Sequence, residues 1–270
     1  MNLYRKAKHL MRVHKIFPKK HLGQNFMVDE NFLQLMVYYA GTKPNIVLEP
    51  GAGFGFLTRL LAQKSKKVLA VEKDTRLVKI LREELSNFSN VELIEGDILK
   101  IFLPAFDEVV SNPPFSISSP LLFLLLKRNF NHAVLTFQTD FAKRLNAEPG
   151  SKNYSRLTVS TYYHAEVELY EGIPKEAFYP QPDVSAVIVR LKPKKKPFHV
   201  KDEKIFEEVL RILFTQRNRK VRNAIQPFLS RYKSEDNTAL KEANHLPFHN
   251  KRVRDLAPED FGVLANEFTS

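Results

Sequence analysis

A short apolar run that leads directly into a glycine-rich loop and then into a helix sets the fold of this chain. Residues 45–49 read NIVLE, residues 50–55 read PGAGFG, and residues 56–62 have the composition of a helix. A strand, a glycine loop and a helix in this order begin the α/β folds that bind nucleotides, because glycines let the backbone approach a ligand. The Gly-x-Gly-x-Gly spacing differs from the Gly-x-Gly-x-x-Gly of nicotinamide-binding proteins, so the loop alone identifies no ligand.

Three further apolar runs each lead to a polar residue. These runs and residues are 68–71 with Glu72, 91–94 with Asp97, and 106–110 with Asn112. Because the carboxyl ends of parallel strands meet at one edge of a sheet, we expect the polar side chains to line one ligand site with Gly51 and Gly53. Each acid alone could be a helix cap or a surface charge, but four strand ends with one pattern favour a site.

The acidic residues of this edge suit an adenosine ligand. Glu72 ends the second strand at the position where a ribose diol needs an acceptor. Asp97 can accept a hydrogen bond from an adenine amino group, with Ile98 packing on the ring. No acid or base suited to hydride transfer stands out, which argues against a nicotinamide cofactor.

Residues 111–115 (SNPPF) follow the fourth strand and suit chemistry on a planar amino group. The Asn112 side-chain carbonyl and the Pro113 backbone carbonyl can accept hydrogen bonds from amino hydrogens, which draws that nitrogen toward a tetrahedral, nucleophilic geometry. Phe115 offers a ring face on which a base can stack. Asn-Pro and Pro-Pro also occur in ordinary turns, so an ordinary turn is the alternative interpretation.

The charge balance favours a phosphate-rich partner. The 270 residues include 42 Lys and Arg against 30 Asp and Glu, a net charge of +12 with a pI near 9.7. An anionic membrane surface is the second expectation. No apolar stretch approaches the roughly 20 residues of a membrane-spanning helix, and no secretory signal begins the chain. Without cysteine, and with eight scattered histidines, neither disulfides nor a metal site is expected. We therefore expect a soluble, cytoplasmic protein.

Two basic clusters are candidates for contacts with phosphates. Residues 1–20 contain seven cations and no acid, namely Arg5, Lys6, Lys8, Arg12, Lys15, Lys19 and Lys20. The second cluster consists of Arg211, Arg217, Arg219, Lys220 and Arg222. We predict that residues 1–20 form a basic arm that follows a nucleic-acid backbone, and a solvated tail is the alternative.

Further motifs extend over almost the whole chain. They are 22–26 (LGQNF), 48–53 with 57–58, 71–74 (VEKD), 96–97, 111–115, 138–145, 148–152 (EPGSK), 178–185 (FYPQPDVS), 216–220 and 256–261. Together they resemble the ribosomal RNA small-subunit adenine dimethyltransferase family, the KsgA type, which uses S-adenosylmethionine. The glycine loop is shared by many methyltransferases, whereas GQNF and F-x-P-x-P-x-V-S are more specific.

The resemblance implies a reaction and a substrate. Methyl groups pass from S-adenosylmethionine, which becomes S-adenosylhomocysteine, to N6 of two adjacent adenosines in a 3′-terminal hairpin loop of small-subunit ribosomal RNA. Dimethyladenosines result, and the substrate is expected within an immature subunit. The base must leave any stacked helix to reach the site.

The resemblance also implies roles for individual residues. The catalytic residues it implies are Asn112, Pro113, Phe115 and Phe178. The cofactor-binding residues it implies are Gln24, Asn25, Met27, Gly51, Gly53, Glu72, Asp97, Ile98 and Asn112. Phe178 would supply the second face of the base pocket opposite Phe115, and sequence alone leaves open that it only anchors its loop.

Two positions depart from the family pattern, and two other functions stay open. Pro113 stands where the family commonly has Leu, and Phe115 where many relatives have Tyr, so the ring can still stack but has no hydroxyl to donate.

One alternative function is methylation of large-subunit RNA by an enzyme of the antibiotic-resistance type. The other is a weakly catalytic ribosome-assembly or RNA-binding factor. The complete cofactor edge argues against the second, and residues 148–152 favour the small-subunit branch.

The expected architecture is an α/β class I methyltransferase (Rossmann-like) fold. Its seven-stranded sheet has one antiparallel strand, and its last strands are 133–137, 167–170 and 184–191. The basic, proline-interrupted segment 192–197 is the best domain boundary. The predicted domains are the arm 1–20, a methyltransferase domain 21–192, and a linker with a helical RNA-binding domain 193–270. We expect a monomer.

Overall fold

The computed structural model describes residues 2–18, 23–41, 45–232 and 242–269, which form two compact units. Unit 1 comprises Met1–Ala142 and Val167–Pro193, and unit 2 comprises Lys143–Glu166 and Lys194–Ser270. Within these described ranges, every helix is too short or too polar to span a bilayer.

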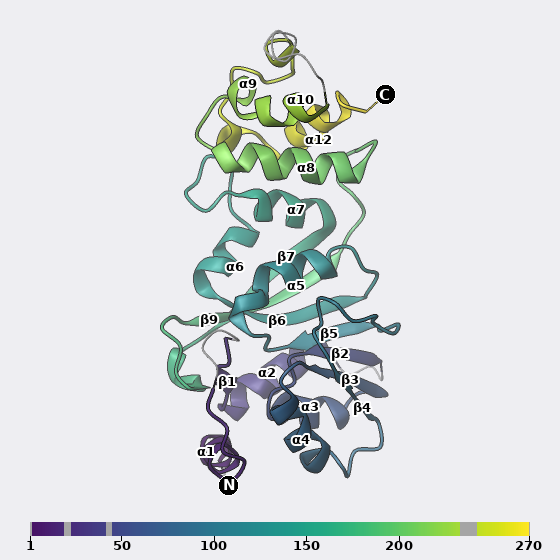
Figure 1. Cartoon of the computed structure of the whole chain (residues 1–270), viewed down its shortest axis with the longest axis vertical. Helices are drawn as coiled ribbons and strands as arrows, with labels where there is room; N and C mark the ends of the chain where they lie inside the picture. Colours follow the sequence, from purple (N-terminus) through teal and green to yellow (C-terminus); the bar gives the residue numbers. More distant parts are fainter. Residues whose placement is uncertain (1, 19–22, 42–44, 233–241, 270) are drawn as a thin grey trace. The chain divides into compact units, whose positions relative to one another are not determined.

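Unit 1 is built on a seven-stranded sheet with helices on both faces (Figure 1). In order across the sheet, the strands are β4 (Val91–Glu95), β3 (Lys67–Glu72), β2 (Ile46–Pro50), β5 (Glu108–Ser111), β6 (His132–Gln138), β9 (Ala186–Pro193) and β7 (Ala165–Ile173). Strands β4 to β6 in this order pair in parallel, and β9 runs antiparallel to β6. The predicted class I methyltransferase sheet is confirmed.

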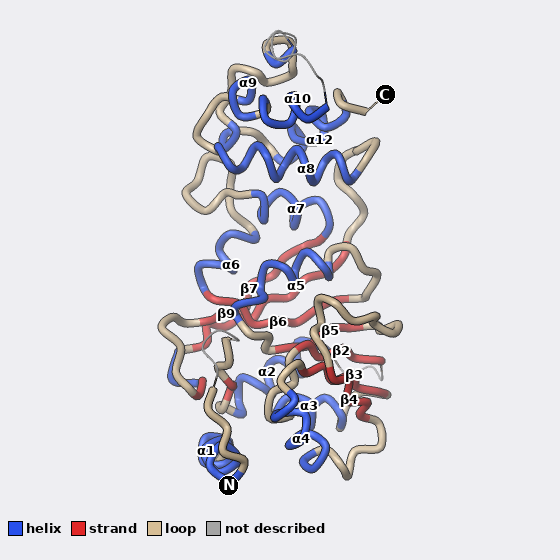
Figure 2. Tube along the Cα trace, in the orientation of Figure 1, coloured by secondary structure: helices blue, strands red, loops and turns tan. Residues whose placement is uncertain are grey.

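The central strands are apolar because both of their faces are covered. Leu48, Val109 and Leu135 lie on three neighbouring strands and are fully buried. Helices α2 (Glu30–Ala40), α3 (Phe56–Ala62) and α4 (Thr75–Glu84) cover one face, and α5 (Ser118–Leu125) covers the other (Figure 2). This covering explains why the sequence shows continuous apolar runs rather than alternation.

The start of α2 follows the sequence prediction. The Asp29 side chain accepts the Asn31 N–H at the N-cap, and the helix ends at Gly41 with φ 90°. Helix α6 (Thr139–Leu145) follows β6. Two short 3₁₀ helices are η2 (Phe115–Ile117) and η3 (Lys175–Ala177).

A second, two-stranded sheet lies outside the main one. Strand β1 (Phe26–Met27) pairs antiparallel with β8 (Phe178–Tyr179), with Phe26 opposite Tyr179. This pairing joins two segments that are far apart in the sequence. It brings the Gly-Gln-Asn-Phe motif beside the Phe-x-Pro-x-Pro motif.

The predicted basic arm is in fact largely a packed helix. Helix α1 (Leu3–Val13) buries Ala7, Leu10 and Met11 in the core of unit 1. Apolar residues three and four positions apart form a buried stripe, and the surrounding cations conceal this stripe in the sequence. Lys6 forms an ion pair with Glu84 of α4. Lys19 and Lys20 lie outside the described residues.

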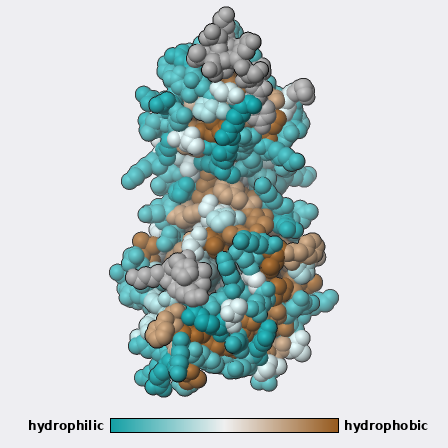
Figure 3. Space-filling model, in the orientation of Figure 1, coloured by the Kyte–Doolittle hydropathy of each residue, from teal (hydrophilic) through white to brown (hydrophobic). Residues whose placement is uncertain are grey.

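Unit 2 is helical. Its elements are α7 (Arg156–His164), α8 (Glu203–Leu213), η4 (Phe214–Gln216), α9 (Val221–Ala224), α10 (Gln226–Tyr232), η5 (Val253–Asp255) and α12 (Pro258–Asn266). Buried rings such as Phe206, Phe228 and Phe261 form its core. Its surface is mainly hydrophilic in the view of Figure 3.

The two units do not follow the predicted domain bounds throughout. The boundary after Pro193 lies one residue from the predicted start of the linker. Residues 143–166, however, belong to unit 2 although the sequence prediction included them in the methyltransferase domain. The physical reason is that Tyr154, Val159 and Tyr163 bury their side chains in the core of unit 2.

Candidate active site

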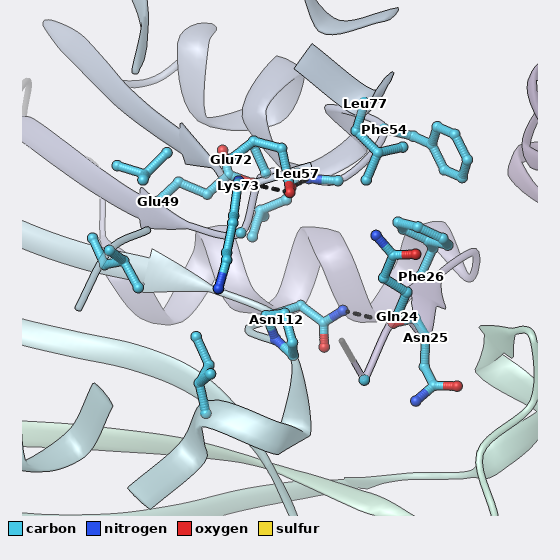
Figure 4. Close-up of a pocket in the computed structure, with 18 of the residues that line it drawn as sticks. Gln24, Asn25, Phe26, Glu49, Phe54, Leu57, Glu72, Lys73, Leu77 and Asn112 are labelled. Carbon is cyan, nitrogen blue, oxygen red and sulfur yellow. Dashed lines mark hydrogen bonds between the residues drawn. The ribbon is translucent and has the colours of Figure 1, made fainter. Parts of the chain in front are cut away.

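A cavity of about 300 Å³ opens at the carboxyl ends of β2, β3, β4 and β5. All nine residues expected to bind the cofactor line it: Gln24, Asn25, Met27, Gly51, Gly53, Glu72, Asp97, Ile98 and Asn112. Figure 4 shows Glu49, Glu72 and Asn112 reaching this space from strand ends, with Gln24 and Asn25 bordering it from another segment. Of the four residues expected to be catalytic, only Asn112 lines this cavity.

Two glycines let the glycine loop lie close to its neighbours at the cavity, because a side chain at either position would meet neighbouring atoms. Gly51 has φ 77°, and a Cβ there would lie 2.9 Å from the Pro114 Cδ. Gly53 has φ 61°, and a Cβ there would lie 3.0 Å from the Phe26 ring. Side chains at either position would strain the backbone and push the loop away from its neighbours.

The Glu72 carboxylate holds this loop in place. Its Oε2 accepts the Gly53 N–H at 2.9 Å, and its Oε1 accepts the N–H groups of Lys73 and Asp74 at 2.8 Å each. Burial raises the pKa of Glu72, although the three backbone donors oppose this shift. Glu72 is therefore both a cavity carboxylate and a structural acceptor, and sequence reasoning had assigned only the first role.

Asp97 lies on the same edge and is paired with a lysine. Its Oδ2 accepts from the Lys73 Nζ at 2.9 Å, and its Oδ1 accepts the Leu99 N–H at 3.1 Å. The hydrogen bond from Lys73 is the main reason that the pKa of Asp97 is lowered. The carboxylate is therefore ionised and able to accept a hydrogen bond from a ligand. Ile98 is 5% exposed beside it and contributes an apolar wall.

The Gln24–Met27 segment reaches the cavity through contacts that the sequence did not reveal. The Gln24 Nε2 donates to Asp74 Oδ2 at 3.0 Å. Arg76 also binds the Asp74 carboxylate through two nitrogens and holds the pKa of Asp74 well below its usual range. Asp74, at the N-cap of α4, thus anchors the segment to the end of β3.

The Asn112 amide is held from both ends. The Thr136 hydroxyl donates to Asn112 Oδ1 at 2.5 Å, and the Asn112 Nδ2 donates to the Asn25 carbonyl at 3.4 Å. These partners fix which end of the amide carries the oxygen. Thr136 is a fully buried residue of β6, and its place in an apolar run gave no signal in the sequence.

The remaining three candidate catalytic residues lie next to this cavity rather than in its lining. Pro113 directly follows Asn112 and is buried. The rings of Phe115 and Phe178 are 6.0 Å apart between centroids with an interplanar angle of 67°. The sequence predicted that the faces of these two rings lie on opposite sides of a base. In the structure the rings instead meet edge to face.

Phe178 also anchors its own loop. It is 2% exposed and belongs to the core of unit 1. The alternative interpretation from the sequence thus describes the observed packing. A base can enter between the two rings only if at least one of them turns, since stacking needs ring faces rather than an edge.

Glu49 is a cavity residue that sequence reasoning missed. It lies near the end of the first strand of the sheet, is 2% exposed, and its Oε2 has no hydrogen-bond partner among the described residues. Burial, with a smaller contribution from Glu72, raises its pKa from 4.5 to about 8 against the effect of the Thr58 hydroxyl. The signal available in the sequence was an acid at the end of an otherwise apolar strand.

Replacing Glu49 with glutamine should change how stability depends on pH. Between pH 4.5 and about 8 the folded state holds a proton that the unfolded state has released, so wild-type stability falls as the pH rises. Glu49→Gln has no such proton. As the pH rises from 4.5 to about 8, the free energy of unfolding of Glu49→Gln should therefore increase relative to that of wild type, by on the order of a few kcal/mol in total. Urea unfolding at several pH values tests this, and a constant difference would contradict a raised pKa.

The second basic cluster is partly structural. The Arg217 guanidinium donates to the carbonyls of Ser151 and Lys152 at 2.7 and 2.9 Å. Arg222 donates to Asn250 Oδ1 at 2.8 Å. Arg219 and Lys220 are exposed and form no ion pair among the described residues. These two residues are the better candidates for contacts with phosphates.

Comparisons with known proteins identify the family of this chain. A sequence model of the ribosomal RNA adenine dimethylase family matches residues 17–268. The chain is 44% identical over 247 residues to the "Probable ribosomal RNA small subunit methyltransferase A" of Methanosarcina acetivorans, covering 90% of this chain and 91% of the relative. It is 42% identical over 255 residues to the protein of the same name from Methanopyrus kandleri, covering 93% and 92%.

Two solved structures are similar over most of the chain. One is a dimethyladenosine transferase from Plasmodium falciparum, with a TM-score of 0.75 and 30% identity over 89% of this chain and 96% of that one. The other is the 23S rRNA methyltransferase ErmE, with a TM-score of 0.64 and 27% identity over 91% and 100%. The chain therefore belongs to the ribosomal RNA adenine dimethylase family of S-adenosylmethionine-dependent methyltransferases.

Proposed function

We propose that this enzyme transfers methyl groups from S-adenosylmethionine to N6 of two adjacent adenosines in a 3′-terminal hairpin loop of small-subunit ribosomal RNA. The main support for this proposal is the cavity lined by the expected cofactor residues, which include Asn112. Pro113 and Pro114 directly follow Asn112. The proposed products are dimethyladenosines, and the proposed substrate is an immature small subunit. The cytoplasmic location and the monomeric state remain predictions.

The cavity residues fit the proposed cofactor. Glu72 can accept from the ribose hydroxyls, and Asp97 with Ile98 can hold the adenine. The Glu49 Oε2, buried without a partner among the described residues, can accept from a cationic amino group. A cavity with these acceptors and apolar walls suits a ligand that combines an adenosine with positive charge.

The chain's own residues would act on the acceptor base. S-adenosylmethionine supplies an electrophilic methyl group bound to a cationic sulfur. The Asn112 Oδ1 and the Pro113 carbonyl would accept the N6 hydrogens, so that the nitrogen lone pair points at the methyl carbon. No backbone hydrogen bond to the Pro113 carbonyl is found among the described residues, which leaves it available. Phe115 would hold the base by stacking.

No strong general base is required at this site. The methylated nitrogen carries positive charge and loses its proton easily to solvent. The described residues around Asn112 offer carbonyl acceptors and rings rather than a histidine. This composition suits N6 methylation.

Labelled cofactor and purified ribosomal subunits test the proposal. The protein would be incubated with radiolabelled S-adenosylmethionine and, separately, small and large subunits that lack these methyl groups. We expect label in the small-subunit RNA. Label confined to the large subunit would favour the antibiotic-resistance type of activity, and no label in either would favour an assembly factor.

A further inference from the structure

The exposed cations of helix α1 lie on one face of that helix. Arg5, Lys8 and Arg12 are exposed and occupy positions i, i+3 and i+7, which share a helical face. None of them forms an ion pair with an acid among the described residues, whereas Lys6 pairs with Glu84. This face therefore carries three charges that no carboxylate of the described chain neutralises.

The position of this face is fixed by packing. Asn2 caps the helix through the Arg5 N–H at 3.0 Å, and Ala7, Leu10 and Met11 are buried beneath it. A loose tail would sample many positions and lose entropy on binding. A docked helix presents its cations in place, so their contribution to binding costs less ordering.

Ring contacts connect this face to the expected base pocket. The Lys8 Nζ lies 4.6 Å from the Tyr4 ring centroid and 5.5 Å from that of Tyr179. Tyr4 and Tyr179 meet edge to face at 5.2 Å. Tyr179 directly follows Phe178, whose ring meets Phe115. The cationic face thus contacts the residue of strand β8 that follows the ring expected to flank the adenosine.

We propose that the α1 face formed by Arg5, Lys8 and Arg12 binds the RNA phosphates that flank the target adenosine. A base that enters beside Phe115 and Phe178 must leave its own backbone just outside the pocket. Phosphates there would meet three cations without acidic partners among the described residues. This inference rests on the proposed function and adds to it the element that holds the acceptor strand.

The test compares two triple variants that remove the same amount of charge. R5Q/K8Q/R12Q removes the α1 charges, and the control K64Q/K66Q/K79Q removes three exposed charges elsewhere in unit 1. Lys64 and Lys66 precede β3, at the strand's opposite end from the cavity. Affinity for the isolated hairpin RNA is measured over a series of salt concentrations, and circular dichroism checks folding.

We expect R5Q/K8Q/R12Q to bind RNA about 10-fold or more weakly at low salt. Its plot of log affinity against log salt should flatten by about 0.7–0.9 for each phosphate that the variant no longer neutralises. Its affinity for S-adenosylmethionine should match wild type. Equal affinity and slope in the two triple variants would overturn the inference. Failure of the wild-type protein to methylate any RNA would instead overturn the proposed function.

A separate observation assigns a positioning role to Thr136, and we infer that its hydroxyl aligns the Asn112 amide for the reaction. The hydroxyl donates to the oxygen that would accept the N6 hydrogen, and the residue is fully buried. A carbonyl oxygen has two lone pairs, so one remains for the substrate. Thr136 does not line the cavity and would act only through Asn112.

Valine has nearly the shape of threonine without the hydroxyl, which makes Thr136→Val a specific test. We expect kcat to fall about 10-fold with an unchanged RNA affinity, and Thr136→Ser to restore the rate. In an Asn112→Ala background, Thr136→Val should cost nothing further. A wild-type rate in Thr136→Val, or an equal reduction in both backgrounds, would overturn this role.

Discussion

Asn112→Ala is expected to lower kcat by about 10²-fold or more and to leave RNA affinity almost unchanged. The Asn112 carbonyl becomes a better partner as positive charge builds on N6, so its contribution belongs mainly to the transition state. RNA affinity is expected to come mainly from contacts with phosphates, which the Asn112 amide is not expected to make. Single-turnover kinetics at saturating cofactor, with RNA binding measured separately, checks both expectations.

Phe115→Ala is the matched comparison for this variant. A stacked ring holds the base in the ground state as well as in the transition state, so removing it should reduce base capture and rate together. A wild-type single-turnover rate in Asn112→Ala would mean that Asn112 is only a turn former. The 2.5 Å hydrogen bond from Thr136 would then be purely structural.

Glu72→Ala is expected to weaken S-adenosylmethionine binding by about 10²-fold. The carboxylate accepts three backbone N–H groups and keeps one acceptor position, on Oε2, for a ribose hydroxyl; a hydrogen bond to a charged group contributes about 1.5–3 kcal/mol. The same carboxylate accepts the Gly53 N–H, so the variant also releases the loop that approaches the ligand. Isothermal titration calorimetry measures the affinity directly.

Glu72→Gln separates the two roles of this residue. Glutamine retains an oxygen for one backbone N–H but loses the charge, so its affinity should lie between those of wild type and Glu72→Ala. Urea unfolding of both variants shows how much of the effect comes from the loop. Cofactor affinity equal to wild type in Glu72→Ala would remove this residue from the site.

The sheet could be predicted because its strands are apolar runs of ordinary length that end in chemically distinctive residues. Glu72, Asp97 and Asn112 each follow such a run, and parallel strands bring such residues to one edge. The nine expected cofactor residues therefore all line one cavity. Their roles there still await the measurements above.

Features that depend on contacts distant in the sequence could not be predicted. Strands β1 and β8 have two residues each, too few to show a periodic pattern. Thr136 lies within an apolar strand, where a single polar residue gives no indication of its partner. The Phe115 and Phe178 rings were expected to face each other, but no sequence pattern determines a ring angle.

The basic residues gave the most incomplete prediction. In residues 1–20 the charge conceals a helix whose buried apolar stripe is only three residues, Ala7, Leu10 and Met11. In the second cluster, Arg217 donates to two backbone carbonyls of its own unit. Net charge predicts the kind of partner, whereas packing decides which cations remain exposed to meet it.

Nucleotide-resolution mapping tests the central proposal most directly. Small-subunit RNA methylated by the purified protein is digested, its nucleosides are identified by mass spectrometry, and the modified positions are located by primer extension. We predict dimethyladenosine at two adjacent positions of the 3′-terminal hairpin loop, absent when Asn112→Ala replaces wild type under the same short reaction time. Methyl groups at another base, or only in large-subunit RNA, would contradict the proposal.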